Sequence, residues 1–195
     1  ISYIISQNII GSSPIRLEIG DQSLEGEQIS STVIKMKLLN PIDSYQINSI
    51  TLPDTDFVIK EVICGNKHIV IWNCKNKDKN KALSLLKSHN YTFEHYNISF
   101  AYSSDQKISL ETIERGVGKT LSCGSAALSA YLSYPENLSG HWQDLRIETS
   151  SGYITMGNDN GTIFIIGPTH RVFSGNFTVR YKTMDKRNSH DAAEK

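Results

Sequence analysis

The feature that most constrains the fold is a run of alanine, leucine and serine from residue 124 to about residue 134, which begins directly after a cysteine. This composition favours a helix that is buried on most of its sides. Pro135 follows the run and predicts the end of the helix. Such a helix needs apolar surface around it, so the remaining chain must supply the layers that cover it.

The remaining chain has the pattern of short strands separated by turns. Alternating or β-branched apolar residues predict strands at 1–11, 14–20, 31–39, 47–52, 57–59, 69–72, 96–103, 107–114, 144–149, 153–156, 162–166 and 176–181. A second helix is predicted at about 78–88, with Ala82, Leu83 and Leu86 on one face. Many short antiparallel strands around one buried helix indicate an α+β fold and not alternating βαβ units.

The composition argues against several classes of partner. Lysine plus arginine and aspartate plus glutamate are equal at 20 each, so we expect no nucleic-acid partner and no binding to an anionic membrane surface. No apolar run has the length needed to span a bilayer. The three cysteines have neither a disulfide-framework nor a zinc-site spacing, which predicts a reducing, cytoplasmic compartment and no metal site.

Cys123 is predicted to lie at the N-terminus of the buried helix. Unpaired N–H groups and the helix dipole at such a position favour the thiolate, and a carboxylate can dock beside it on the N–H groups of Gly124 and Ser125. The alternative is that Cys123 is a small buried apolar residue at a strand-to-helix junction. The first interpretation predicts a site that binds an acid and moves a proton.

Three segments resemble diaminopimelate epimerase, in the order that the family has them. Residues 114–127 resemble its signature E-R-G-x-G-E-T-x-A-C-G-[ST]-G-A, from which Lys119 and Ala126 depart. The positions in register are Glu114, Arg115, Gly116, Gly118, Thr120, Cys123, Gly124, Ser125 and Ala127. Residues 65–70 resemble the family's G-N-P-H-[AC]-V segment, and residues 96–100 resemble its V-N-[VI]-x-F segment. Weaker similarities extend the resemblance to roughly residues 14–180.

The resemblance implies two like halves, each a small antiparallel barrel around a central helix, with the active site between them. It implies residues 1–35 as end strands of the N-terminal half, 36–182 as the C-terminal epimerase-like domain and 183–195 as a polar tail. The implied reaction interconverts LL- and meso-2,6-diaminopimelate. One cysteine from each half transfers a proton on opposite faces of the α-carbon, and no cofactor takes part.

The resemblance also assigns roles to residues of this chain. Cys123 is the catalytic thiol of the second half, and Glu114 and His68 are catalytic residues that set protonation near the reacting thiol and amine. Gly124 and Ser125 bind the reacting carboxylate through their main-chain N–H groups, and Glu114 is also counted among the substrate-binding residues. The side chains of Asn66, Asn97 and Arg115 hold the distant carboxylate and amine of diaminopimelate.

The family's first catalytic cysteine has no counterpart before residue 64. Together with the initial Ile1, this suggests a truncated chain, or one whose N-terminal half is supplied separately; a homodimer is a further possibility. Cys64-Gly65-Asn66 imitates the first-half motif, but it already aligns with the G-N-P-H segment. Cys74 is expected to be a strand-end residue without a catalytic part.

Two alternatives to a diaminopimelate epimerase remain open from the sequence. One is a degenerate, non-catalytic binding domain that keeps the anion-binding helix end but lacks the two-thiol mechanism. The other is a sister racemase or isomerase of the same fold. Glu114-Arg115 and Asn97 favour diaminopimelate over the substrates of these sister enzymes.

Overall fold

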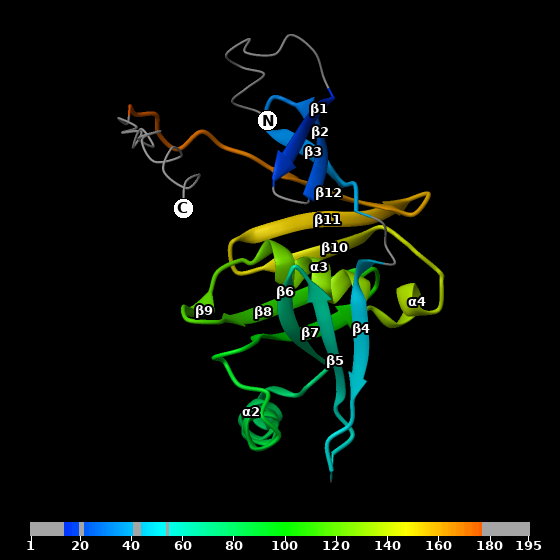
Figure 1. The fold of residues 1–195 in the computed structure, drawn as a ribbon, viewed down its shortest axis with the longest axis vertical. Helices are drawn as coiled ribbons and strands as arrows, with labels where there is room; N and C mark the ends of the chain where they lie inside the picture. Colours follow the sequence, from blue (N-terminus) through cyan, green and yellow to red (C-terminus); the bar gives the residue numbers. More distant parts are fainter. Residues whose placement is uncertain (1–13, 20–21, 41–43, 54, 177–195) are drawn as a thin grey trace, which may run out of the picture.

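The computed structural model describes residues 14–19, 22–40, 44–53 and 55–176. Within these residues one mixed sheet carries two main helices, on opposite faces. Figure 1 shows β1–β3 at the upper end of the molecule, α3 behind β5 and β6 in the middle, and α2 at the lower end. None of the described helices has the length and apolar character that crossing a membrane requires.

The sheet follows the order β1-β2-β3-β12-β11-β10-β8-β7-β6-β5-β4, and β9 pairs with β8. The strands are β1 (Ile15–Ile19), β2 (Gln22–Ser30), β3 (Val33–Leu38), β4 (Gln46–Ile50), β5 (Val58–Cys64), β6 (Asn66–Trp72), β7 (Asn97–Ser104), β8 (Lys107–Glu114), β9 (Gly118–Thr120), β10 (Leu145–Thr149), β11 (Gly152–Asp159) and β12 (Thr162–Pro168). The helices are α2 (Lys79–Ser88), preceded by the short 3-10 turn η2 (Asn76–Asp78), and then α3 (Gly124–Leu132) and α4 (Pro135–Leu138).

Strands β6 and β7 are covered by a helix on each face. Ile69 and Ile71 of β6 belong to the apolar cluster beneath α2, whereas Val70 and Trp72 belong to the cluster around α3. Because successive side chains of a strand point to opposite faces, this alternation fixes which face each residue of these strands uses. Parallel strands buried on both faces have nearly continuous apolar sequences, as β6 does.

An ion pair to the sheet holds the start of α2. Lys79 Nζ lies 2.7 Å from a carboxylate oxygen of Glu111 on β8 and also sits above the Phe100 and Tyr102 rings of β7. The hydrogen bond from Lys79 holds the pKa of Glu111 below its usual value. This contact fixes α2 against the strands that carry part of the candidate site.

The α+β class is confirmed, but the predicted antiparallel barrel is not supported. The described strands form an open path that runs from β1 to β4, and no pairing among them joins these two ends. The β6–β7 and β10–β8 pairs are parallel, so the sheet is mixed. Sheet pairing does not by itself divide a chain into domains, so the boundaries predicted at 35/36 and 182/183 stay predictions.

The structure also corrects several predicted elements. The central helix ends at Leu132, and Pro135 begins the short helix α4, because proline fits the first position of a helix. Strand β2 was not predicted, since Gln22–Ser30 has few apolar residues to mark an alternation. Apart from residue 176, the strands predicted at 1–11 and 176–181 and the tail at 183–195 lie outside the described residues.

Gly157 supplies a test of the packing between β11 and β12. It pairs with Phe164 across the two strands, and a Cβ at this position would collide with the Phe164 ring and the Asp144 carboxylate. We therefore expect Gly157→Ala to lower the free energy of unfolding by roughly 1–3 kcal/mol. Urea denaturation measures this change. Gly175→Ala is the matched control, because a Cβ there meets nothing within 4 Å; equal effects of the two substitutions would contradict this account.

Candidate active site at the N-terminus of α3

Strand alternation brings most of the predicted site residues to the face of the sheet that α3 covers. His68 shares this face of β6 with Val70, and Asn97 lies opposite His68 in the parallel β6–β7 register. On β8, Glu114 lies on the same side as Leu110, which also packs around α3. The strands thus present these three residues at the rim where α3 begins.

Cys123 is the N-cap residue of α3, with an extended backbone conformation and no capping hydrogen bond from its side chain. Its thiol is half-buried and lies 3.4 Å from the Ser125 hydroxyl oxygen. Gly124 is exposed, and a Cβ there would meet open space. The first amides of a helix have no intrahelical acceptor, so a ligand carboxylate could reach the N–H groups beside the thiol.

A glycine-dependent turn leads from β8 to Cys123. Gly116 and Gly118 have φ angles of 75° and 92°, which side-chain-bearing residues rarely adopt. Between β8 and β9, this turn leaves Glu114 half-buried and Arg115 exposed. The two glycines of the signature are therefore explained by the tight return of the chain.

Asn97 is engaged within the protein. Its side-chain oxygen accepts a hydrogen bond of 2.8 Å from the Arg115 N–H, and its amide nitrogen lies 3.4 Å from His68 Nε2. Only 8% of Asn97 is exposed. Asn97 thus holds the Arg115 backbone, and the direct substrate contact that the resemblance implies for it stays a prediction.

His68 is fully buried, and burial lowers the pKa of its imidazole to about 4 against the opposing effect of Glu114. Its Nδ1 has no hydrogen-bond partner among the described residues. The imidazole is therefore neutral near pH 7. It lies behind the rim rather than on its open surface.

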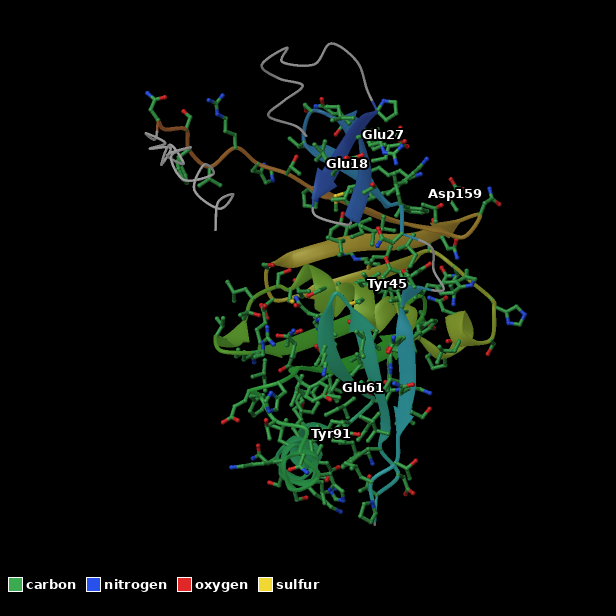
Figure 2. All side chains as sticks on the ribbon, viewed as in Figure 1. Glu18, Glu27, Tyr45, Glu61, Tyr91 and Asp159 are labelled. Atoms are coloured by element: carbon green, nitrogen blue, oxygen red, sulfur yellow. The ribbon has the colours of Figure 1, made fainter. Side chains whose placement is uncertain are left out.

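Tyr96 anchors the segment that leads into Asn97. Its hydroxyl donates a 2.9 Å hydrogen bond to Glu61 of β5, and burial together with this carboxylate raises the pKa of Tyr96 to about 12. Figure 2 shows Glu61 on β5, with Tyr45 nearer to α3 and Tyr91 nearer to α2. Through this hydrogen bond, Glu61 of β5 holds the segment just before β7 in place.

Cys64 has a structural partner that the sequence did not reveal. Its sulfur lies 3.2 Å from the Ser129 hydroxyl, which in turn donates a 2.8 Å hydrogen bond to the Ser125 carbonyl. Burial raises the pKa of the Cys64 thiol. The four-residue spacing of Ser125 and Ser129 could have predicted the bond between these two serines, but nothing in the sequence marks Cys64 as their neighbour. Cys64 therefore supports the same helix turn that presents Cys123.

The two departures from the family signature have different environments. The Lys119 side chain is 68% exposed and pairs with Glu111 at 3.3 Å, so its contact is on the outer surface. Ala126 is fully buried in the cluster around α3. Its side chain therefore occupies the core side of the helix and leaves the exposed Gly124 edge open.

A hydroxyl-lined pocket of about 330 Å³ lies beside the cysteine and was not predicted. Ser122, which precedes Cys123, forms one wall, and the turn between β10 and β11 contributes Thr149 and Ser151. Pro168 and His170, at and beyond the end of β12, complete the opposite side. β10 runs parallel to β8, so the C-terminal ends of both strands point in the same direction.

The structure brings the predicted residues together in two groups. His68, Asn97 and the Arg115 backbone form one hydrogen-bonded group, and Cys123 with Ser125 forms the other. Asn66 is exposed at the start of β6. In the described part of the chain, no cluster of histidine, cysteine and carboxylate side chains has the arrangement of a metal site.

The buried His68 generates a prediction for the pH dependence of stability. Its pKa in the folded state is about 4, below the ordinary 6.5, so the unfolded chain binds more protons between these values. Stability should therefore fall by up to about 3 kcal/mol as the pH decreases from 6.5 to 4. Urea unfolding across this range measures the effect. His68→Gln should flatten the slope, and the exposed His141→Gln should not; a slope unchanged by His68→Gln would refute the assignment.

Comparison with known proteins gives a sequence relative for most of the chain. The diaminopimelate epimerase of Rickettsia rickettsii (strain Sheila Smith) is 30% identical in an alignment of 150 residues, and the match covers 70% of this chain and 55% of that enzyme. The chain thus spans about half the length of the curated relatives that it matches. No family profile matches the chain.

Solved structures of low sequence identity share the fold. A phenazine biosynthesis protein of the PhzF family from Bacillus anthracis superposes with a TM-score of 0.55 at 14% identity, over 87% of this chain and 71% of that protein. A hydroxyproline epimerase from Agrobacterium vitis, solved with bound trans-4-hydroxy-L-proline, gives a TM-score of 0.56 at 11% identity, over 86% and 60%. The sequence relationship and the shared fold together identify the chain as a homologue of the diaminopimelate epimerases.

Proposed function

We propose that this chain is the second-cysteine part of a cofactor-independent amino-acid epimerase, in the isomerase class, that interconverts LL- and meso-2,6-diaminopimelate. The observation that carries the proposal is the half-buried Cys123 at the N-terminus of α3, next to an exposed glycine and close in sequence to Glu114-Arg115. The similarity to diaminopimelate epimerases over 70% of the chain supports the choice of substrate.

The proposed reaction is a proton transfer through two thiols. The Cys123 thiolate removes the α-proton, or its thiol donates one, depending on the isomer, and a planar carbanion lies between the two steps. Inversion requires a second acid or base on the opposite face of this carbanion. The opposing thiol would come from a segment that faces Cys123. The relative contains residues that this chain does not match, since the match covers 55% of its length.

The helix end would stabilise the reacting carboxylate. N–H groups at Gly124 and Ser125 can donate to it, and the positive end of the helix dipole favours the negative charge that develops on the carbanion. The open space around Gly124 supports this role, because a side chain there would stand between ligand and backbone. The serine hydroxyl, at 3.4 Å from the thiol, is a partner for the Cys123 sulfur.

The distant end of the substrate would be held by charge. Arg115 is exposed and can bind the second carboxylate, and the half-buried Glu114 can bind the second ammonium group. Asn66 is exposed and available to the same ligand. Asn97 would act through its bond to the Arg115 backbone, and neutral His68 would fill the space behind Asn97 without adding charge.

The first test is the relative reactivity of the three thiols. Cys123 should react with iodoacetamide faster than Cys64 and Cys74, which are 8% and 2% exposed. Peptide mass spectrometry after timed alkylation of the folded protein measures the three rates, and alkylation in guanidinium chloride provides the control in which they should become similar. Faster modification of either buried cysteine would refute the assignment of Cys123 as the accessible thiol.

The second test is exchange of the substrate α-proton. We expect the protein to exchange the α-proton of LL-diaminopimelate with solvent deuterium, and Cys123→Ala to reduce the rate at least about a hundredfold, because the group that moves the proton is gone. Proton NMR follows the loss of the α-signal. Cys74→Ala is the control, since Cys74 lies in the α2 cluster.

Three outcomes of the exchange experiment would contradict the proposal. Exchange that survives Cys123→Ala would exclude this thiol as the proton carrier. Exchange of trans-4-hydroxy-L-proline with none of diaminopimelate would assign the chain to a sister enzyme. Absence of exchange with either compound, together with saturable binding of diaminopimelate, would indicate a non-catalytic binding domain.

A further inference from the structure

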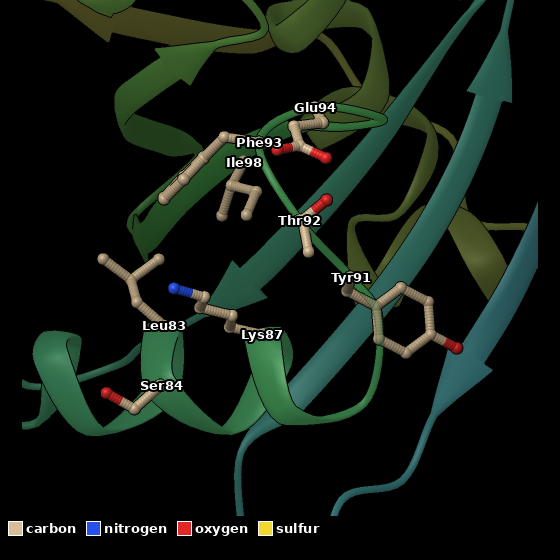
Figure 3. Close-up of a pocket in the computed structure, with 8 residues that line it drawn as sticks. All are labelled: Leu83, Ser84, Lys87, Tyr91, Thr92, Phe93, Glu94 and Ile98. Atoms are coloured by element: carbon tan, nitrogen blue, oxygen red, sulfur yellow. The ribbon is translucent and has the colours of Figure 1, made fainter.

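A second pocket lies far from Cys123, on the other face of the sheet. It has a volume of about 320 Å³ and is formed between α2 and the segment that leads into β7. Figure 3 shows Leu83, Ser84 and Lys87 along α2, with Thr92, Phe93 and Glu94 on the facing segment. Its size is at the lower end of the range for small-molecule sites.

The body of this pocket is apolar and partly aromatic. Ile98 forms a buried side, and Leu83, Tyr91 and Phe93 add apolar surface around it. Phe93 is 40% exposed, which is high for a residue of its size. This lining suits a branched or aromatic side chain of a ligand. Ile98 also adjoins Asn97, so an occupant would touch the strand that carries part of the candidate active site.

A buried hydroxyl in the wall has no protein partner. Thr92 Oγ1 is shielded from solvent and makes no hydrogen bond with the described residues. Buried polar groups are nearly always paired in folded proteins. Because this oxygen is closed off from solvent, Thr92 lines the pocket with its other atoms, and an occupant meets an apolar surface there.

Two opposite charges border the same pocket. The Lys87 ammonium and Glu94 carboxylate come from the two sides of the cavity, and neither forms an ion pair within the described part of the chain. In Figure 3 the lysine nitrogen lies on the Leu83 side and the glutamate oxygens lie beyond Thr92. A ligand that carries both an anionic and a cationic group complements this pair.

From these features we propose that the pocket between α2 and residues 91–98 binds a free α-amino acid with an apolar, preferably aromatic, side chain. The side chain packs on Leu83, Phe93 and Ile98. The carboxylate pairs with Lys87 and the ammonium group pairs with Glu94. Both charges are exposed and the pocket is open to solvent, so the affinity should lie in the millimolar range.

Methyl NMR of the whole chain tests this proposal with three probes: L-phenylalanine, 3-phenylpropionate and phenethylamine. L-phenylalanine should shift the methyl signals of Leu83 and Ile98 saturably, and each singly charged analogue should bind about fivefold more weakly. Lys87→Met should remove the advantage of phenylalanine over phenethylamine, and Glu94→Gln its advantage over phenylpropionate. Lys81→Met, on an exposed position of α2, is the matched control and should change nothing.

Several results would overturn the proposal. They are the absence of saturable shifts at Leu83 and Ile98 with all three probes, equal binding of the three probes, and loss of phenylalanine binding in Lys81→Met to the same degree as in Lys87→Met. Because binding is measured without catalysis, the outcome is independent of whether the chain is an epimerase.

Discussion

The structure depends on the burial of β6 and β7 between two helices. A strand covered on both faces cannot shift its register by one residue without moving every side chain to the wrong helix. Ile69 and Ile71 are committed to α2, while Val70 and Trp72 are committed to α3. This constraint also fixes the polar residues at the start of each strand. His68 and Asn97 meet because their strands are held in parallel register by apolar neighbours.

The candidate site uses the same arrangement at its open end. The apolar part of α3 is held from Ala126 onward, and its first turn emerges at the rim with Cys123 and an exposed Gly124. Below the rim, Ser129 links the helix to the buried Cys64 thiol. Cys123 thus lies above a packed part of the helix, although the residue itself is partly accessible. A proton-transfer site needs this combination, because the thiol must be oriented and must also reach a ligand.

Much of the fold could be predicted from the sequence, because its signals are local. The central helix follows from its apolar composition and the strands from β-branched or alternating residues. Strand β2 was not predicted, because Gln22–Ser30 lacks an apolar pattern of its own and is paired with β1 and β3. The predicted barrel followed from the family resemblance, and strand pairing between distant segments is not encoded in any one window of sequence.

The site was predictable as a set of residues but not as a set of contacts. Glycine spacing and the cysteine before the helix identified residues 114–125. The hydrogen bond from the Arg115 backbone to Asn97 and the pairing of Cys64 with Ser129 join residues far apart in the chain. Such contacts depend on register between strands and on the rotation of α3. Sequence similarity could therefore name Asn97 but could not reveal that its side chain is already engaged.

The proposed site requires the N-terminus of α3 to bind the carboxylate of an amino-acid substrate beside Cys123. Amide NMR of the 15N-labelled protein during a titration with LL-diaminopimelate measures this binding residue by residue. We expect the amide signals of Gly124 and Ser125 to shift most, and Arg115→Ala to weaken binding while these two signals still respond. The largest shifts elsewhere, with the Gly124 and Ser125 signals unchanged at saturation, would contradict it.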